Sequence, residues 1–294
     1  MGKADRNRRQ SARERIAAQQ AAARRAERRK QMLVTGGSVV AVLAIVATFV
    51  IINAFRHSTT AAAKNIATVE KQITSVPVST LNKVGAGNAL SYNSKPIVPI
   101  SGSPPLTSNG KPEVLYVGAE YCPFCATERW AMTVALSRFG TFSGLNFIHS
   151  SSTDTFTSTP TMTYYKSSYT SKYVNFTPVE TLTVAKAPLQ TTTAAQNALM
   201  AKYNVPPYTA HAGDIPFVDF GNQLLLSGTQ FNPQVLAGKA WPQVAAALRD
   251  PSTAIAQGGD GAANTFTAAI CKLTNNQPAS VCSLPAIQKI EAGF

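Results

Sequence analysis

The sequence predicts an α/β fold (an α+β sandwich) with a central mixed sheet, preceded by one transmembrane helix. Three observations support this prediction. A short apolar run at residues 114–117 precedes residues 126–139, where apolar side chains recur at helical spacing. Two apolar runs joined by Gly221 and Asn222 predict a β-hairpin over residues 215–226. Residues 33–55 carry no charge and are long enough to cross a hydrocarbon layer of about 30 Å.

A basic arm, residues 1–32, precedes the apolar stretch. Up to Lys30 it has eleven Lys or Arg and three acidic residues, which accounts for 8 of the 13 net positive charges. Because cytoplasmic flanks of membrane helices retain an excess of Lys and Arg, we expect a single-pass protein of the cell membrane, with a cytoplasmic N-terminus. The arm is expected to contact anionic lipid. It has no aromatic residues to read bases, so no nucleic-acid partner is expected.

A cleaved signal peptide is the alternative interpretation of residues 33–55, because Ala61, Ala62 and Ala63 resemble a cleavage region. The apolar run, however, exceeds the length of about 7 to 15 residues that is usual in cleaved signals. We therefore expect an uncleaved anchor, with the C-terminal domain outside the cytoplasm.

Composition divides the remainder of the chain. Residues 56–112 are rich in Ser, Thr, Asn, Gly and Pro, which predicts an extended stalk or linker. Residues 113–250 form the predicted globular domain, with an insertion at about 150–212, and residues 251–294 a disulfide-tied helical tail. The further elements expected are a strand at residues 145–149 and helices at residues 60–74, 194–203, 241–248, 264–273 and 285–290.

Cys122 and Cys125 open the predicted helix and enclose Pro123 and Phe124. This spacing places the first sulfur at a helix N-terminus, where unpaired N–H groups and the helix dipole favour a thiolate. We expect Cys122 to attack and Cys125 to resolve. The same spacing also serves zinc sites and inert disulfides. Zinc would require two further nearby ligands, so we expect no metal and no cofactor.

All four cysteines follow the apolar stretch, on the side where disulfides persist. Their clustering favours the pairs Cys122 with Cys125 and Cys271 with Cys282. The second pair is expected to be a structural disulfide of the tail, which contributes about 2 to 3 kcal/mol by loop closure.

Residues 119–125, Ala-Glu-Tyr-Cys-Pro-Phe-Cys, resemble the active-site segment of the thioredoxin superfamily, and Ile215-Pro216 resembles its cis-proline. The resemblance implies a thioredoxin-like sheet, and a loop at Ile215 and Pro216 that faces the dithiol and binds substrate together with Pro123 and Phe124. Taken alone, Pro216 is better interpreted as a proline at a strand entry; the cis-proline interpretation depends on its order after the strand and helix of the cysteine pair.

The sequence departs from that family at the buried acid, whose place Tyr116 takes. Glu120 and Glu128 are candidate substitutes, although a solvated charge is the simpler interpretation of each. The plan of basic arm, anchor and enlarged domain is similar to an uncharacterised family, domain of unknown function 929.

These resemblances imply a membrane-tethered, extracytoplasmic thiol–disulfide oxidoreductase that forms or exchanges disulfides in exported proteins. We expect its partners to be exported proteins with thiols and a membrane redox partner, such as a quinone-linked enzyme. Two alternatives remain open: an envelope disulfide reductase of the same fold, and a non-catalytic membrane-anchored scaffold.

Overall fold

The structure is a computed structural model that describes residues 24, 25, 27, 28, 65–92 and 97–294. The chain divides into two compact units, Met1–Lys64 and Asn65–Phe294, and the fold described below is that of the second unit. The predicted membrane segment, residues 33–55, lies outside the described residues. Within the described ranges, no helix has the length and apolarity needed to span a bilayer.

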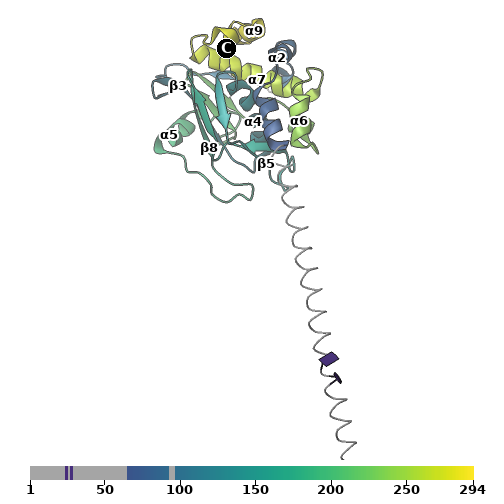
Figure 1. The fold of residues 1–294 in the computed structure, drawn as a ribbon. Coiled ribbons are helices and arrows are strands. Elements are labelled where there is room, and N and C mark those ends of the chain that lie inside the picture. Colours follow the sequence, from purple (N-terminus) through teal and green to yellow (C-terminus); the bar gives the residue numbers. More distant parts are fainter. Residues whose placement is uncertain (1–23, 26, 29–64, 93–96) are drawn as a thin grey trace, which may run out of the picture. The chain divides into compact units, whose positions relative to one another are not determined.

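A six-stranded mixed sheet lies at the centre of the unit (Figure 1). Its strands are β1 (Val98–Pro99), β2 (Thr107–Ser108), β3 (Lys111–Gly118), β8 (Asn175–Glu180), β9 (Phe217–Phe220) and β10 (Leu224–Ser227). The central strand β3 runs parallel to β8 and antiparallel to β9. β9 and β10 form an antiparallel hairpin, and β1 pairs with the far side of β10. The predicted mixed α/β architecture is confirmed.

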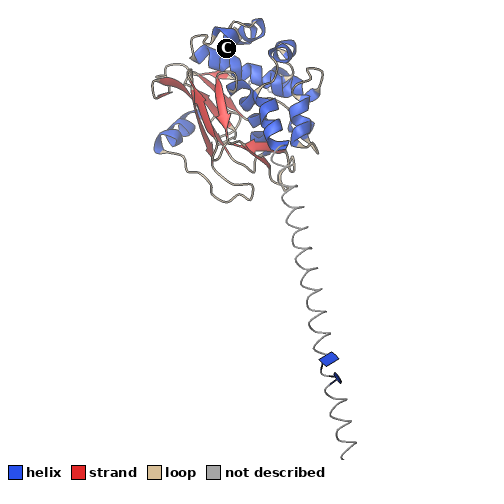
Figure 2. Cartoon of the chain, viewed as in Figure 1, coloured by secondary structure: helices blue, strands red, loops and turns tan. Residues whose placement is uncertain are grey.

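Both faces of the sheet are covered by helices (Figure 2). These helices are α4 (Pro123–Leu136), α5 (Ala194–Tyr203) and α7 (Ala254–Leu273). Val114 and Tyr116 of β3 belong to the core shared with α4 and α7, whereas Leu115 and Val117 belong to the core shared with α5. Because β3 is buried on both faces, its residues form a continuous apolar run without polar alternation.

The strand that runs parallel to β3 comes from a later part of the chain than the strand expected at residues 145–149. Four short strands form two separate antiparallel pairs, β4 (Gly140–Ser143) with β7 (Ser168–Ser171) and β5 (Asn146–His149) with β6 (Pro160–Thr163). The strand expected at residues 145–149 therefore exists, as β5, but lies outside the central sheet. The parallel neighbour of β3 is β8, within the expected insertion at residues 150–212. Periodicity predicts that a strand forms but not which strand it pairs with.

Residues 65–92 pack onto the domain, whereas their composition predicts an extended linker. They form a helix at residues 65–74, then α2 (Val78–Val84) and α3 (Ala89–Tyr92). Ile73 is fully buried, and Asn264 of α7 donates from Nδ2 to the carbonyl oxygens of Leu81 and Gly85, both at 2.8 Å. The few apolar residues of this segment are sufficient to hold it on the domain, because α7 provides both apolar contacts and hydrogen bonds to it.

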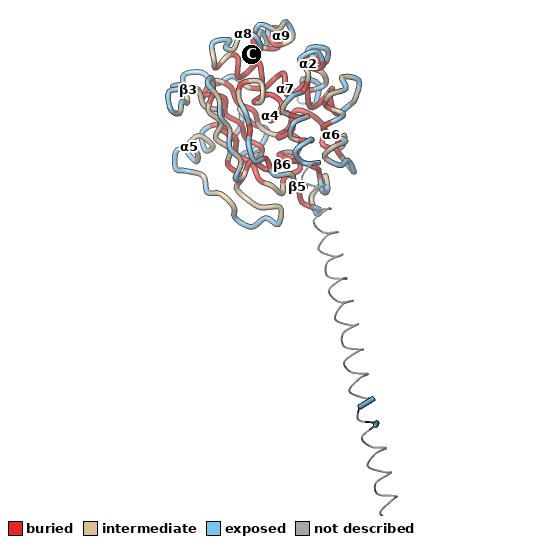
Figure 3. The backbone as a smooth tube through the Cα atoms, in the orientation of Figure 1, coloured by how far each residue is buried: buried red, intermediate tan, exposed pale blue. Residues whose placement is uncertain are grey.

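The C-terminal region is a layer of the core rather than an appendage. Helix α7 is almost entirely buried and packs along α4, as the buried colouring of Figure 3 shows. Gly261 permits close approach of the preceding helices, since a Cβ there would lie 2.4 Å from the carbonyl oxygen of Ala86. Around α7 lie η1 (Pro233–Leu236), α6 (Trp241–Ala247), α8 (Ala279–Cys282) and α9 (Pro285–Glu291). A disulfide between Cys271 and Cys282 joins α7 to α8.

Candidate functional site

The dithiol lies at the N-terminus of α4. Cys122 is the N-cap residue, and its Sγ accepts a hydrogen bond of 3.3 Å from the backbone N–H of Cys125. Pro123 occupies the first turn, where the missing N–H costs nothing because that position has no helical acceptor. Both cysteines are free thiols, with Cys122 4% exposed and Cys125 fully buried. The first-turn geometry thus presents a backbone donor to the leading sulfur.

The two thiols differ in acidity. Hydrogen bonding from the Cys125 thiol lowers the pKa of Cys122, with further lowering by the backbone N–H of Cys125 and the charge of Arg129, against the opposing effect of burial. Burial raises the pKa of Cys125 well above its ordinary value, and the hydrogen bond to Cys122 adds to that rise. Cys122 is therefore the better thiolate and Cys125 the better proton carrier.

The loop before β9 faces the dithiol. The Cys122 thiol donates to the carbonyl oxygen of Ile215 at 3.8 Å, and the Ile215–Pro216 peptide bond is cis. The carbonyl oxygen of Pro216 accepts a 2.9 Å hydrogen bond from the N–H of Gly228 in the segment after β10. The structure therefore brings Ile215 next to the cysteine pair, although Ile215 lies 93 residues after Cys122 in the chain.

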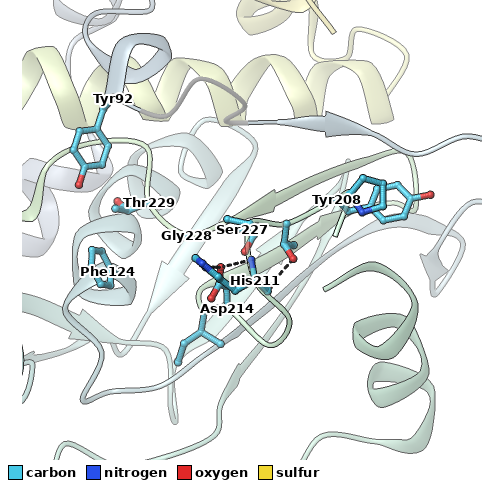
Figure 4. A pocket seen from close by; sticks show the side chains of 12 residues that line it. Tyr92, Phe124, Tyr208, His211, Asp214, Ser227, Gly228 and Thr229 are labelled. Carbon is cyan, nitrogen blue, oxygen red and sulfur yellow. Dashed lines mark hydrogen bonds and ion pairs between the residues drawn. The ribbon is translucent and has the colours of Figure 1, made fainter. Parts of the chain in front are cut away.

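A pocket of about 740 Å³ opens beside this loop (Figure 4). Residues 207–211 and 227–229 form much of its wall, and Asp214, Ile215, Phe124 and Tyr92 complete it. Phe124 also packs edge-on against Phe156, with ring centroids 5.7 Å apart. Ile215 and Phe124 also pack against the cluster formed by Ala119 and the two cysteines, so the pocket and the dithiol share two neighbouring residues.

A buried ion pair lies one helical turn beyond the dithiol along α4. The sequence pattern did not predict it. Arg129, one helical turn after Cys125, donates from Nε and Nη2 to the two carboxylate oxygens of Glu180 at 2.8 and 2.7 Å. Its Nη2 also donates to the carbonyl oxygen of Ala119 at 2.7 Å. The spacing of four residues from Cys125 was an available signal for Arg129. No sequence signal identifies Glu180, because its proximity to Arg129 depends on the pairing of β8 with β3.

Glu128 is not a solvated charge, so that interpretation is wrong. It is fully buried, and its Oε2 accepts from the Thr229 hydroxyl at 2.8 Å and from the Gln230 N–H at 3.0 Å. Burial raises its pKa to about 7. Glu120, by contrast, is partly exposed. Tyr116 is fully buried in β3, and burial raises its pKa well above the ordinary value.

Among the described residues, no group of three or more His, Cys, Asp or Glu side chains is arranged to hold a metal ion.

The fold and the site define a mixed α/β protein with a dithiol at a helix N-terminus, facing a loop from the opposite half of the chain. The chain belongs to the family described as a domain of unknown function, DUF929, which matches residues 97–272. No curated protein and no solved structure matches the chain. The matched range ends within α7, so it includes most of that helix as well as the sheet.

Proposed function

We propose that this protein is a thioredoxin-like thiol–disulfide oxidoreductase, anchored at the outer face of the cytoplasmic membrane, that forms or exchanges disulfides in exported proteins. The observation that carries the proposal is the pair of contacts at Cys122 Sγ, which accepts from the Cys125 N–H and reaches the Ile215 carbonyl oxygen. The first contact favours a thiolate, and the second lies where a substrate chain would approach.

The arrangement of the sheet supports the thioredoxin-like part of the proposal. The resemblance implies a strand, a helix that begins with the dithiol, a parallel strand, and then a hairpin entered through a cis-proline. In this protein β3, α4 and β8 form such a unit, and β9 and β10 form such a hairpin next to β3. Strand β9 begins directly after Pro216.

The chemistry proceeds by two thiol–disulfide exchanges. A substrate thiolate attacks Cys122 Sγ of the oxidised pair; the bond from Cys122 to the substrate forms as the Cys122–Cys125 bond breaks. Cys125 leaves as a thiolate and takes up a proton, as its raised pKa favours. A second substrate thiolate attacks the mixed disulfide and releases the oxidised substrate, which leaves Cys122 reduced. A quinone-linked membrane partner is proposed to remove the two electrons.

A trapping experiment tests the proposal. In the opposite direction of the same exchange, the Cys122 thiolate attacks a substrate disulfide, and Cys125 then attacks Cys122 Sγ and releases the substrate thiol. Cys125→Ser removes that resolving thiol, so substrates should accumulate as disulfide-linked adducts of Cys122 that separate on reduction. The Cys122→Ser and double Cys→Ser variants are matched controls and should trap nothing. Absence of adducts with Cys125→Ser in cells that express the full chain would contradict the proposed activity.

The same pair of cysteines could also run in reverse, as an envelope disulfide reductase. Direction is set by the redox potential of the pair relative to its partners. Equilibration of the purified protein with glutathione redox buffers measures that potential. A value near −120 mV would favour disulfide formation, whereas one near −270 mV would favour reduction.

One observation favours a non-catalytic scaffold instead, namely the low exposure of Cys122 and the complete burial of Cys125. A scaffold would have thiols that do not react in the folded protein. Alkylation of the reduced, folded protein distinguishes the two cases, because the oxidoreductase requires modification of Cys122 without prior unfolding.

The location is proposed from residues 1–55, which combine the basic arm and the apolar segment. Extraction of membranes at alkaline pH should leave the protein in the pellet. Protease added outside the cytoplasm should digest the domain and spare the arm. Release of the full-length protein by alkaline washing would contradict the anchor.

A further inference from the structure

We propose that the pocket beside Cys122 binds a basic side chain, Lys or Arg, that neighbours the reacting cysteine of the substrate polypeptide. This inference deepens the proposed function and rests on it for the identity of the substrate. The preferred substrates are then polypeptides with a positive charge close to the cysteine that exchanges.

The pocket lies close to the reacting thiol. Asp214 lines the pocket and directly precedes Ile215, whose carbonyl oxygen lies 3.8 Å from Cys122 Sγ. A substrate cysteine joined to Cys122 would therefore have its neighbouring residue at the mouth of the pocket. The long side chains of Lys and Arg can lay their methylene stems along apolar surface and extend the charge further.

The lining of the pocket carries a carboxylate. Among the twelve described residues that line the pocket, Asp214 is the sole carboxylate, and none is Lys or Arg. Its side chain is 36% exposed and so open to a ligand. The His211 N–H donates to Oδ2 at 3.1 Å and the His211 ring nitrogen lies 3.3 Å from the same oxygen, which fixes the carboxylate in place. An acidic substrate side chain would meet repulsion here.

Aromatic side chains also line the pocket. Phe124, Tyr92 and Tyr208 all border the pocket. In Figure 4, Asp214 and His211 lie between Phe124 on one side and Tyr208 on the other. Aromatic faces attract cations, and a guanidinium group stacks on them well. A pocket that is lined by one carboxylate and three aromatic rings suits a cation better than it suits a purely apolar side chain.

The experiment uses the full chain in detergent and three disulfide peptides that differ only beside one cysteine, where they carry Arg, Gln or Glu. Reduced protein is mixed with each peptide in a single turnover; its dithiol becomes a disulfide as the peptide disulfide becomes a dithiol. We expect the Arg peptide to react about fivefold faster than the Gln peptide, which corresponds to a partly exposed ion pair of about 1 kcal/mol. The Glu peptide should be slowest.

Variants of Asp214 test the assignment of the charge. Asp214→Asn should bring the Arg-to-Gln rate ratio close to one, and Asp214→Lys should reverse the preference in favour of Glu. Glu291→Gln, in helix α9, is the charge-matched control and should keep the ratio of the unaltered protein. Equal rates for all three peptides, or a preference for Arg that persists in Asp214→Asn, would overturn the inference.

A binding measurement separates failure of this inference from failure of the proposed function. Peptides with both cysteines replaced by serine cannot exchange, yet the Arg peptide should still bind about fivefold more tightly than the Gln peptide, and Asp214→Asn should remove the difference. Selective binding without any exchange would refute the oxidoreductase and retain the pocket. Exchange with no selectivity in rate or binding would refute the pocket alone.

Discussion

Arg129 and Glu180 form a fully buried ion pair, with Nη2 of Arg129 2.7 Å from Oε2 of Glu180 and neither side chain exposed. The pair connects the dithiol helix α4 to the end of β8, the strand parallel to β3. The positive charge of Arg129 also contributes to the lowered pKa of Cys122, and it opposes the rise that burial causes in the pKa of Cys125. One residue therefore contributes to the packing of the fold and to the acidity of the candidate site.

Removal of one partner of this pair should be strongly destabilising. Glu180→Gln leaves the Arg129 guanidinium buried without its counter-charge, and we expect the free energy of unfolding to fall by about 3 to 5 kcal/mol. Urea denaturation measures the change. The double variant Arg129→Met/Glu180→Met should lose less than Glu180→Gln, because no charge stays buried; an equal or larger loss would contradict this account.

The acidity of Cys122 should depend on Cys125. Since hydrogen bonding from Cys125 is the largest cause of the lowered pKa of Cys122, Cys125→Ala should raise that pKa. The alkylation rate of Cys122 by iodoacetamide, followed against pH, should have its midpoint moved to higher pH by the substitution. As a control, Cys271 and Cys282 should stay unmodified, because they are joined in a disulfide. An unchanged midpoint would show that Cys125 does not set the acidity.

Asp260 should make stability fall as pH rises. It is fully buried in α7, neither carboxylate oxygen has a hydrogen-bond partner within the described structure, and burial raises its pKa to about 8. Between about pH 4, where Asp ionises in the unfolded chain, and pH 8 the folded state holds one more proton. This carboxyl group therefore stabilises the fold at the acidic end of that window and loses its contribution toward pH 8, by at most about 1.4 kcal/mol per pH unit.

The variant Asp260→Asn isolates this effect. It should flatten the dependence of the unfolding free energy on pH between 5 and 7.5, measured by urea denaturation. The buried groups Glu128 and Asp219, whose pKa values are raised to about 7 and about 6, act in the same direction and should keep a residual slope. A slope identical to that of the unaltered protein would exclude Asp260 as a contributor.

The disulfide between Cys271 and Cys282 should stabilise the C-terminal layer. It closes a loop with a sequence separation of 11 residues, and its loss should lower the free energy of unfolding by about 2 to 3 kcal/mol. Cys271→Ala/Cys282→Ala provides the test by denaturant titration. Alkylation of Cys122 should keep its rate in this variant. A loss of Cys122 reactivity would indicate that the disulfide supports the site as well as the layer.

Local sequence patterns were sufficient for several elements of the fold. The helix predicted at residues 194–203 has the same bounds as α5, and the hairpin predicted across Gly221 and Asn222 forms as β9 and β10. The helix predicted to open at the cysteine pair begins there, as α4 with Cys122 as its N-cap residue. Helical period, tight-turn residues and a proline in the first turn are properties of neighbouring residues, so a single sequence can report them.

The order of the residues by itself determined where the cysteine pair lies, after a buried strand and at the start of a helix. Only the tertiary structure decided that β8 and not β5 lies beside β3, that α7 forms the second layer of the core, and that Glu128 and Arg129 are buried. These features depend on contacts between residues distant in sequence. The burial of a charge, and the partner that compensates it, are fixed by the whole packed fold and not by the residues on either side.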